Sequence, residues 1–189
     1  WAADYALLLA GNNYTGVNLH GGTGHSVANG LGGSLPGDAL LQQQGETPQQ
    51  IATHPHPFYS PIATFGSEYV LEPVGYGLKF AGAWSGSTFL AADLTAKLQA
   101  AGVNATAYAV KLRSGQRSVA IINKDAAKDV DVTLDFGSAT GGAAALETLR
   151  APSLDSREAL LARGTASHAH KGRVTVTVPH ASAMRVTLL

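Results

Sequence analysis

The sequence predicts a protein of two parts, an α/β part over residues 1–86 and an antiparallel β-sandwich over residues 87–189. In the first part a helix, a strand and a second helix follow one another, as in a parallel α/β unit. After Gly86 the pattern changes to short stretches of alternating apolar and polar residues separated by turns, which is typical of a sandwich. No linker separates the parts, so we expect them to pack firmly together.

The composition excludes several classes of protein. Hydrophobic residues make up 45% of the 189 residues, which is enough for a buried core. Lys plus Arg and Asp plus Glu number 13 each, and this balance predicts neither a polyanion-binding face nor a basic tail, and so no nucleic-acid partner. The absence of cysteine excludes disulfides and thiolate metal sites. No apolar run approaches the ~18 residues of a membrane span, so no membrane partner is predicted.

Residues 1–10 are predicted to form the first helix. Their large apolar residues recur at helical spacing and so share one face: Trp1, Tyr5, Leu8 and Leu9. Gly11 supplies the stop signal. The helix begins on a large apolar residue without an N-cap, as expected of a helix cut in its middle.

The second helix is predicted over residues 72–84. Glu72 and Pro73 form a favourable start, with an acid and a proline at the positive end. Three glycines weaken the helix by up to ~1 kcal/mol each, so we expect tertiary packing to hold it. Small residues at these positions would let the helix lie close against a sheet.

Between the helices, Val17–His20 is predicted to be a strand. Alternation points Val17 and Leu19 to one side, and Asn18 and His20 to the other. Polar side chains at the carboxyl end of a barrel strand face the active-site mouth, which makes His20 a candidate site residue. The alternative for His20 is a buried, hydrogen-bonded histidine without a chemical role.

Residues 21–71 are predicted to form a folded loop. A structureless segment of this length is uncommon inside a domain unless it is functional, and this one is too apolar in places to be a linker. His54 and His56 invite a metal-binding interpretation, but the intervening prolines restrict the backbone and no matching ligands stand nearby. An exposed loop is favoured, and neither a metal site nor a cofactor is predicted.

The second part contains seven predicted strands. They are 88–94, 105–112, 118–123, 130–136, 143–150, 173–178 and 184–189. Residues 156–161 are predicted to be a helical turn or an irregular crossover.

Four segments carry a family resemblance. They are Trp1-Ala2-Ala3-Asp4-Tyr5, Gly16-Val17-Asn18-Leu19-His20-Gly21-Gly22, Phe58-Tyr59-Ser60-Pro61-Ile62 and Gly75-Tyr76-Gly77-Leu78-Lys79-Phe80. Together they resemble the C-terminal part of the β-glucuronidase and heparanase-like enzymes of glycoside hydrolase family 79. The segment 151–155 also resembles part of their β-domain. The resemblance implies the C-terminal fragment of a (β/α)8 TIM barrel, with its last strand and flanking helices, followed by an antiparallel β-sandwich.

The resemblance implies a retaining hydrolase whose two catalytic glutamates lie upstream, outside this chain. The enzyme would act on β-glucuronides or related uronic-acid glycans, and only together with the N-terminal barrel portion, as a second chain or in the uncut protein. A secreted or periplasmic location is also implied. None of the acids in the first part is assigned to catalysis: Asp4, Asp38, Glu46, Glu68 and Glu72.

Tyr59 is the residue that the resemblance implies for substrate binding. Family members hold the sugar carboxylate with a tyrosine from the loop after the eighth strand, and Tyr59 is the best match. The alternative is a buried tyrosine that anchors the loop. His20, Asn18 and Gly21 would line the same mouth. Residues 30–50 depart from the family pattern.

The competing hypothesis is a non-catalytic carbohydrate-binding or interaction module that uses the sandwich alone. Few aromatic residues stand in the predicted sandwich strands, where sugar-binding modules carry exposed aromatic rows. This favours the hydrolase, which also predicts that residues 1–86 cannot bury their apolar faces unaided.

Overall fold

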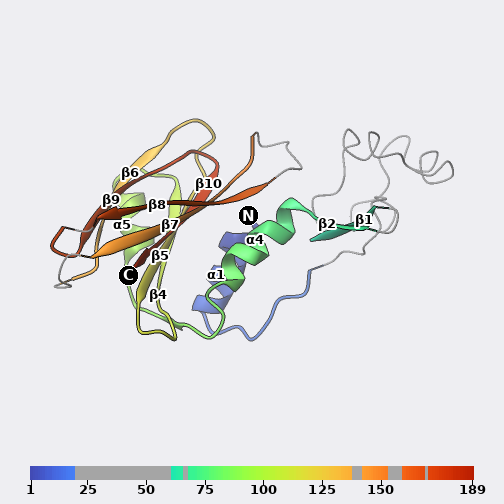
Figure 1. Cartoon of the computed structure of the whole chain (residues 1–189), viewed down its shortest axis with the longest axis horizontal. Helices are drawn as coiled ribbons and strands as arrows, with labels where there is room; N and C mark the ends of the chain where they lie inside the picture. The colour runs from blue at the N-terminus through green and yellow to red at the C-terminus, as the bar shows by residue number, and fades with distance from the viewer. Residues whose placement is uncertain (20–60, 66–67, 138–141, 153–158, 169) are drawn as a thin grey trace.

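The structure is a computed structural model that describes residues 1–19, 61–65, 68–137, 142–152, 159–168 and 170–189 (Figure 1). The helices are α1 (Ala2–Gly11), α4 (Pro73–Gly82) and α5 (Leu94–Ala100). The strands are β1 (Ile62–Phe65), β2 (Glu68–Leu71), β3 (Thr88–Phe89), β4 (Ala105–Lys111), β5 (Arg117–Asn123), β6 (Val130–Asp135), β7 (Ala143–Arg150), β8 (Leu160–His168), β9 (Arg173–Val178) and β10 (Ser182–Leu188).

The described strands are paired antiparallel throughout. Six of them form one sheet in the order β3-β4-β5-β10-β7-β8, while β6 pairs with β9 and β1 pairs with β2. The C-terminal strand β10 inserts between β5 and β7, so the two halves of the large sheet are joined by a strand distant in sequence.

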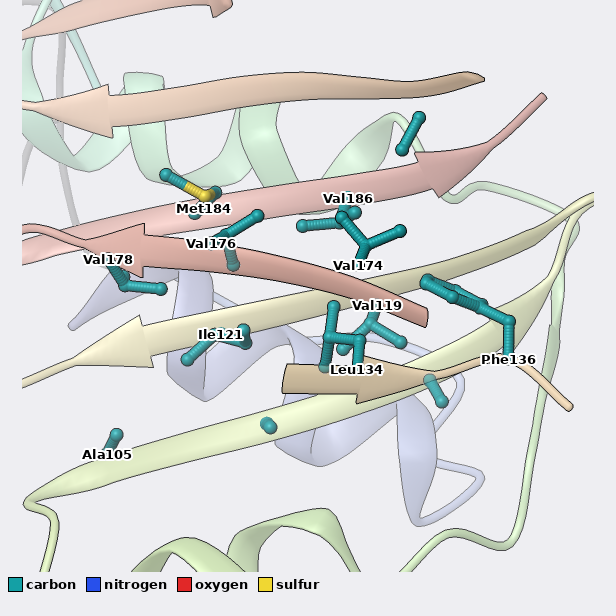
Figure 2. Close-up of a cluster of buried hydrophobic side chains, with 13 residues drawn as sticks. Ala105, Val119, Ile121, Leu134, Phe136, Val174, Val176, Val178, Met184 and Val186 are labelled. Carbon is teal, nitrogen blue, oxygen red and sulfur yellow. The ribbon is translucent and has the colours of Figure 1, made fainter. Parts of the chain in front are cut away.

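The large sheet and the β6–β9 pair enclose the first hydrophobic core (Figure 2). Alternation along the strands directs Val119 and Ile121 of β5 and Met184 and Val186 of β10 into it. From the other side β9 contributes its three valines, each at most 5% exposed. The remaining members are Ala105, Ala107, Ala109, Leu134, Phe136 and Ala144.

Helices α1 and α4 cover the opposite face of the large sheet (Figure 1). The second core combines four residues of the helical part with four of the sheet: Ala3, Leu7, Phe80, Trp84, Val110, Ala120, Ile122 and Ala183. Because both faces of the sheet are covered, every residue of β5 from Ser118 to Asn123 is buried. Burial of one large apolar side chain such as Phe80 stabilises the folded state by about 1.5–3 kcal/mol.

Helices α1 and α4 lie parallel and in close contact. Trp1 and Pro73 line a hollow at their N-terminal ends, while Gly11 and Gly82 line a groove at their C-terminal ends. A Cβ on Gly77 would lie 2.9 Å from the Cβ of Ala2, so the contact requires glycine there. Gly77 therefore allows close contact with α1, whereas Gly75 lies against the Pro61 carbonyl and the Leu71 side chain; we had expected these small residues to contact a sheet.

Three large apolar residues of the first helical turns are exposed to solvent. Trp1, Tyr5 and Leu8 are 70%, 38% and 48% exposed, and the rings of Trp1 and Tyr5 stack at 5.5 Å between centroids. The sheet instead receives Ala3 and Leu7. The helix thus carries apolar residues on two faces, and the described part of the chain covers one of them.

In the second part, most predicted strands are confirmed within about two residues, and three segments differ. The predicted strand 88–94 is reduced to the two residues of β3, because the chain then leaves the edge of β4. Helix α5 follows, and its Leu94 and Leu98 pack against the first core. Leu160 and Leu161 begin β8, which pairs with β7 where we had predicted a turn or crossover.

The first part also differs from the prediction. Val17–Leu19 carry no strand assignment, because a strand needs a hydrogen-bonded neighbour and none of the described strands pairs with them. The end of the predicted 21–71 loop contains the β1–β2 hairpin, in which Ile62 lies opposite Leu71. Glu72 N–H then donates to the Pro61 carbonyl at 3.0 Å, directly before α4 begins.

Thr95 of α5 satisfies the outer edge of β4 beyond the end of β3. Its hydroxyl donates to the Ala107 carbonyl at 3.0 Å and accepts from the Ala107 N–H at 2.9 Å. One side chain therefore occupies both backbone groups that a neighbouring strand would pair with at this position.

Arg185 of β10 joins the large sheet to α4. Its guanidinium forms an ion pair with Glu147 of β7, donates to the Phe80 carbonyl at 2.7 Å and lies 5.1 Å from the centroid of the Phe80 ring. The two charged side chains are only 13% and 16% exposed. Burial lowers the pKa of Arg185 from its ordinary value.

Two further buried polar contacts connect the layers. Trp84 Nε1 donates to Ser118 Oγ at 3.2 Å, which links the end of the helical part to β5. Asn123 Nδ2 donates to the Val178 carbonyl at 3.2 Å, which links β5 to β9. Each contact satisfies a polar group that would otherwise be costly to bury.

Replacing Arg185 with Met should lower the free energy of unfolding by about 1–3 kcal/mol, because the mostly buried Glu147 carboxylate is left without its charged partner. Urea unfolding followed by circular dichroism measures the loss. The double variant Arg185→Met/Glu147→Leu should recover most of it, since a buried apolar pair is often as stable as a buried ion pair. A double variant as unstable as the single one would show that the charge is not the cause.

Candidate functional site

The sequence-predicted site residues fall mostly outside the described part of the chain. His20, Gly21 and Tyr59 lie in residues 20–60, as do His54 and His56. Asn18 is described and exposed, on the extended segment that leads from α1 toward residue 20. The role of these residues therefore stays a prediction.

The N-terminal ends of α1 and α4 form one side of a hollow of about 330 Å³. Trp1, Pro73 and Gly77 line it from the helices. Lys124 and Arg150 line it from the end of the large sheet. The hollow therefore combines an exposed indole with two cations at the junction of the helices and the sheet.

A larger groove of about 800 Å³ lies at the C-terminal ends of the same helices. Leu78, Trp84, Phe89 and Leu90 give it an apolar lining. This groove therefore lies at the opposite end of the helix pair from the N-terminal ends, toward which the candidate residues are predicted to lie.

Asp4 forms a polar bracket between α1 and the sheet. Its Oδ1 accepts hydrogen bonds from Thr106 Oγ1 at 2.6 Å and from the Tyr108 hydroxyl at 2.7 Å, and Lys124 Nζ lies 3.5 Å from Oδ2. Burial acts to raise the pKa of Asp4, but the hydrogen bonds from Thr106 and Tyr108 and the Lys124 charge outweigh it, so the pKa is lowered. Burial, together with the Asp4 carboxylate, raises the pKa of Tyr108.

This set of contacts around Asp4 was not predicted from the sequence. Asp4 is the polar residue in an otherwise apolar helix, and that isolation is the signal that it has a buried partner. The hydrogen bonds of Asp4 to Thr106 and Tyr108 hold α1 against β4.

Two further searches concern the described residues alone. Their side chains include no group of three or more His, Asp or Glu placed to hold a metal ion. Their helices include none that is long and apolar enough to cross a bilayer.

Comparison with solved structures relates the fold to glycoside hydrolases. The crystal structure of the GH51 arabinofuranosidase from Xanthomonas axonopodis pv. citri aligns with a TM-score of 0.54 and 18% identity, over 69% of this chain and 29% of its own. The α-L-arabinofuranosidase from Thermotoga maritima, in an arabinose complex, aligns with a TM-score of 0.52 and 14% identity, over 69% of this chain and 31% of its own.

The chain spans about a third of the length of these structures, which at such low identity show a shared fold. No protein-family model matches the chain, and no curated protein does. The described fold is thus similar to one portion of glycoside hydrolases. The Xanthomonas enzyme belongs to glycoside hydrolase family 51 and not to family 79.

Replacing Asp4 with Ala should lower the free energy of unfolding by about 1–3 kcal/mol at about pH 7, because Thr106 and Tyr108 lose a charged acceptor. The folded-state pKa lies below the ordinary value of 3.8. The stabilisation is therefore complete above that value and is lost as the pH falls through the lowered pKa. Urea unfolding at about pH 7 and about pH 3 measures both effects.

Tyr108→Phe serves as the companion variant. It keeps the carboxylate and removes one donor, so it should cost about 1 kcal/mol at about pH 7. An Asp4→Ala loss that stays constant from neutral to acidic pH would contradict the assignment of the charge to this bracket.

Proposed function

We propose that this chain is the C-terminal part of a retaining glycoside hydrolase that acts on β-glucuronides or related uronic-acid glycans. Residues 1–86 then belong to a (β/α)8 barrel, and residues 87–189 form a β-sandwich domain beside it. One observation carries the proposal: α1 and α4 lie parallel, share one face against the sheet and leave the other apolar face of α1 exposed.

The parallel arrangement supports a barrel. Two neighbouring helices that run in the same direction need a long return connection, and in α/β barrels that return contains a strand. Here the connection runs from Asn12 to Glu72, and Val17–Leu19 lie in it in neither a helix nor a strand. A barrel strand at this place would find its hydrogen-bonding neighbours in another portion of the barrel.

The exposed apolar face of α1 supports the same reading. A helix that is apolar on nearly all sides is typical of the interior of a larger protein. In α1 the sheet side receives Leu7, the α4 side receives Ala2, and Trp1, Tyr5 and Leu8 face outward. The remaining barrel helices and strands would cover these three side chains.

The proposed chemistry needs groups from both portions. Retaining hydrolysis requires two carboxylates about 5–5.5 Å apart, one as acid and base and one as nucleophile. We place both in the N-terminal barrel portion. This chain would contribute Tyr59, whose hydroxyl donates to the uronate carboxylate, with His20, Asn18 and Gly21 along the same mouth. Neither a metal nor a cofactor takes part in this mechanism.

If the barrel covers the outer face of α1, Leu8→Asp should destabilise the native enzyme by several kcal/mol, because it buries an unpaired carboxylate in an apolar interface. Differential scanning calorimetry and loss of hydrolysis measure this. Gln99→Asp, at an exposed position of α5, is the matched control and should leave both unchanged. An equally harmless Leu8→Asp would mean that the face is open to solvent in the native protein.

Replacing Tyr59 with Phe should lower kcat/KM for p-nitrophenyl β-glucuronide by about 10–100-fold, because one hydrogen bond to a carboxylate is worth about 1.5–3 kcal/mol. Hydrolysis of p-nitrophenyl β-glucoside, which has no carboxylate, should fall much less. An unchanged ratio of the two activities would remove Tyr59 from carboxylate recognition.

The native protein itself tests the proposed reaction. Intact mass analysis shows whether a barrel portion accompanies the chain, and a β-glucuronide assay tests the substrate class. Hydrolysis by the 189-residue chain alone would place the catalytic carboxylates within it. Hydrolysis of arabinofuranosides in preference to glucuronides would reject the uronate, and sugar binding without any hydrolysis would favour the non-catalytic module.

A further inference from the structure

One end of the large sheet gathers positive charge. The β4–β5 hairpin carries Lys111, Arg113 and Arg117. Arg173 is the first residue of β9, and Lys171 lies in the turn before it. The two groups are adjacent, because Arg117 donates to the Phe136 carbonyl and Phe136 N–H donates to the Gly172 carbonyl at 2.9 Å. We name these five residues the basic end.

The basic end carries an excess of positive charge, although the whole chain has a net charge of zero. It holds five of the 13 Lys and Arg residues. The segments that meet there, 111–117, 135–137, 142–145 and 170–173, contain one acid, Asp135. Asp135 pairs with Arg173 at 3.0 Å. Among the described residues, neither Lys111 nor Lys171 has an ion-pair partner.

Two of these cations are placed at some cost to stability. Lys111 lies directly opposite Arg117 in the β4–β5 register, and like charges in that position repel. Lys171 adopts a φ of +51° in the turn before β9, a conformation that is uncommon for lysine. Neither side chain belongs to a hydrophobic core, and a bound anion would offset the repulsion between Lys111 and Arg117.

The surface at this end is suited to a hydrated anion. Asp135, Gly137, His170, Lys171 and Arg173 line an open hollow of about 550 Å³. Nearby, Phe136 is buried, so it offers no ring on which a base could stack. Single-stranded nucleic acids are bound on such aromatic platforms, and their absence from these lining residues favours a non-aromatic polyanion.

We propose that the basic end binds an acidic polysaccharide through its carboxylate or sulfate groups. The choice of a polysaccharide rests on the proposed function, while the need for a polyanion rests on the charges alone. The basic end lies opposite the end of the sheet that carries Lys124 and Arg150, near the N-termini of α1 and α4. It would therefore hold the glycan chain away from the site of hydrolysis.

The double variant Lys111→Gln/Lys171→Gln tests the proposal in the native protein. Both side chains are exposed and outside the cores, so folding should be retained. The control Lys97→Gln/Lys128→Gln removes the same charge at exposed positions elsewhere. Isothermal titration or affinity electrophoresis is run with polygalacturonate, dextran sulfate, neutral dextran and double-stranded DNA.

We expect the basic-end variant to bind polygalacturonate or dextran sulfate about 5–20-fold more weakly, and the slope of log Kd against log salt to fall by about 1–2, as lost counterion release requires. The control variant should match the unmodified protein, and neutral dextran should not bind. The two acidic polymers distinguish carboxylate from sulfate recognition.

Equal weakening by both double variants would overturn the proposal, as would unchanged binding by the basic-end variant. Tighter binding of DNA than of either polysaccharide would overturn the choice of ligand. Hydrolysis of β-glucuronides is measured in parallel. If the basic-end variant loses polysaccharide binding but still hydrolyses β-glucuronides, the proposal is supported. If the unmodified protein hydrolyses no β-glucuronide but binds polysaccharide through the basic end, only the proposed function is contradicted.

Discussion

The partly buried ion pair of Arg185 and Glu147 is the contact on which the arrangement of the two parts depends. Arg185 stands on the strand that completes the large sheet, and it donates to the Phe80 carbonyl of α4. An arginine in this place tolerates few positions of its neighbours, because each buried donor needs an acceptor. The helix pair is thereby fixed on the sheet in one orientation, and the Asp4 bracket fixes α1 at a second point.

The sequence predicted the helices and most strands because their periodicity follows from contacts within one element. Val174, Val176 and Val178 alternate cleanly, and β9 has the predicted bounds. β8 was missed because its Gly164 and small polar residues favour strands weakly, and pairing with β7 decides its conformation. Helix α5 was missed because its seven residues are held by packing of Leu94 and Leu98 on the core.

The functional surfaces were harder to predict, since they depend on what distant segments bring together. A composition with equal numbers of acids and bases predicts no charged face, yet the hairpin register brings Lys111 and Arg117 together and sets them beside Lys171. The apolar spacing of Trp1, Tyr5, Leu8 and Leu9 predicted one face of a helix, and the first three of these side chains are exposed together. Periodicity alone could not predict that a second face of α1, formed by Ala3 and Leu7, packs against the sheet.

The Thr95 contact has a consequence for how copies of the protein behave when crowded together. An open strand edge is a template on which another molecule can add a strand, and the short β3 leaves much of β4 without a neighbour. The hydroxyl of Thr95 takes up both main-chain groups of Ala107, so an incoming strand would have to displace α5 first. Thr95 thereby hinders the addition of a further strand at this position of the sheet edge.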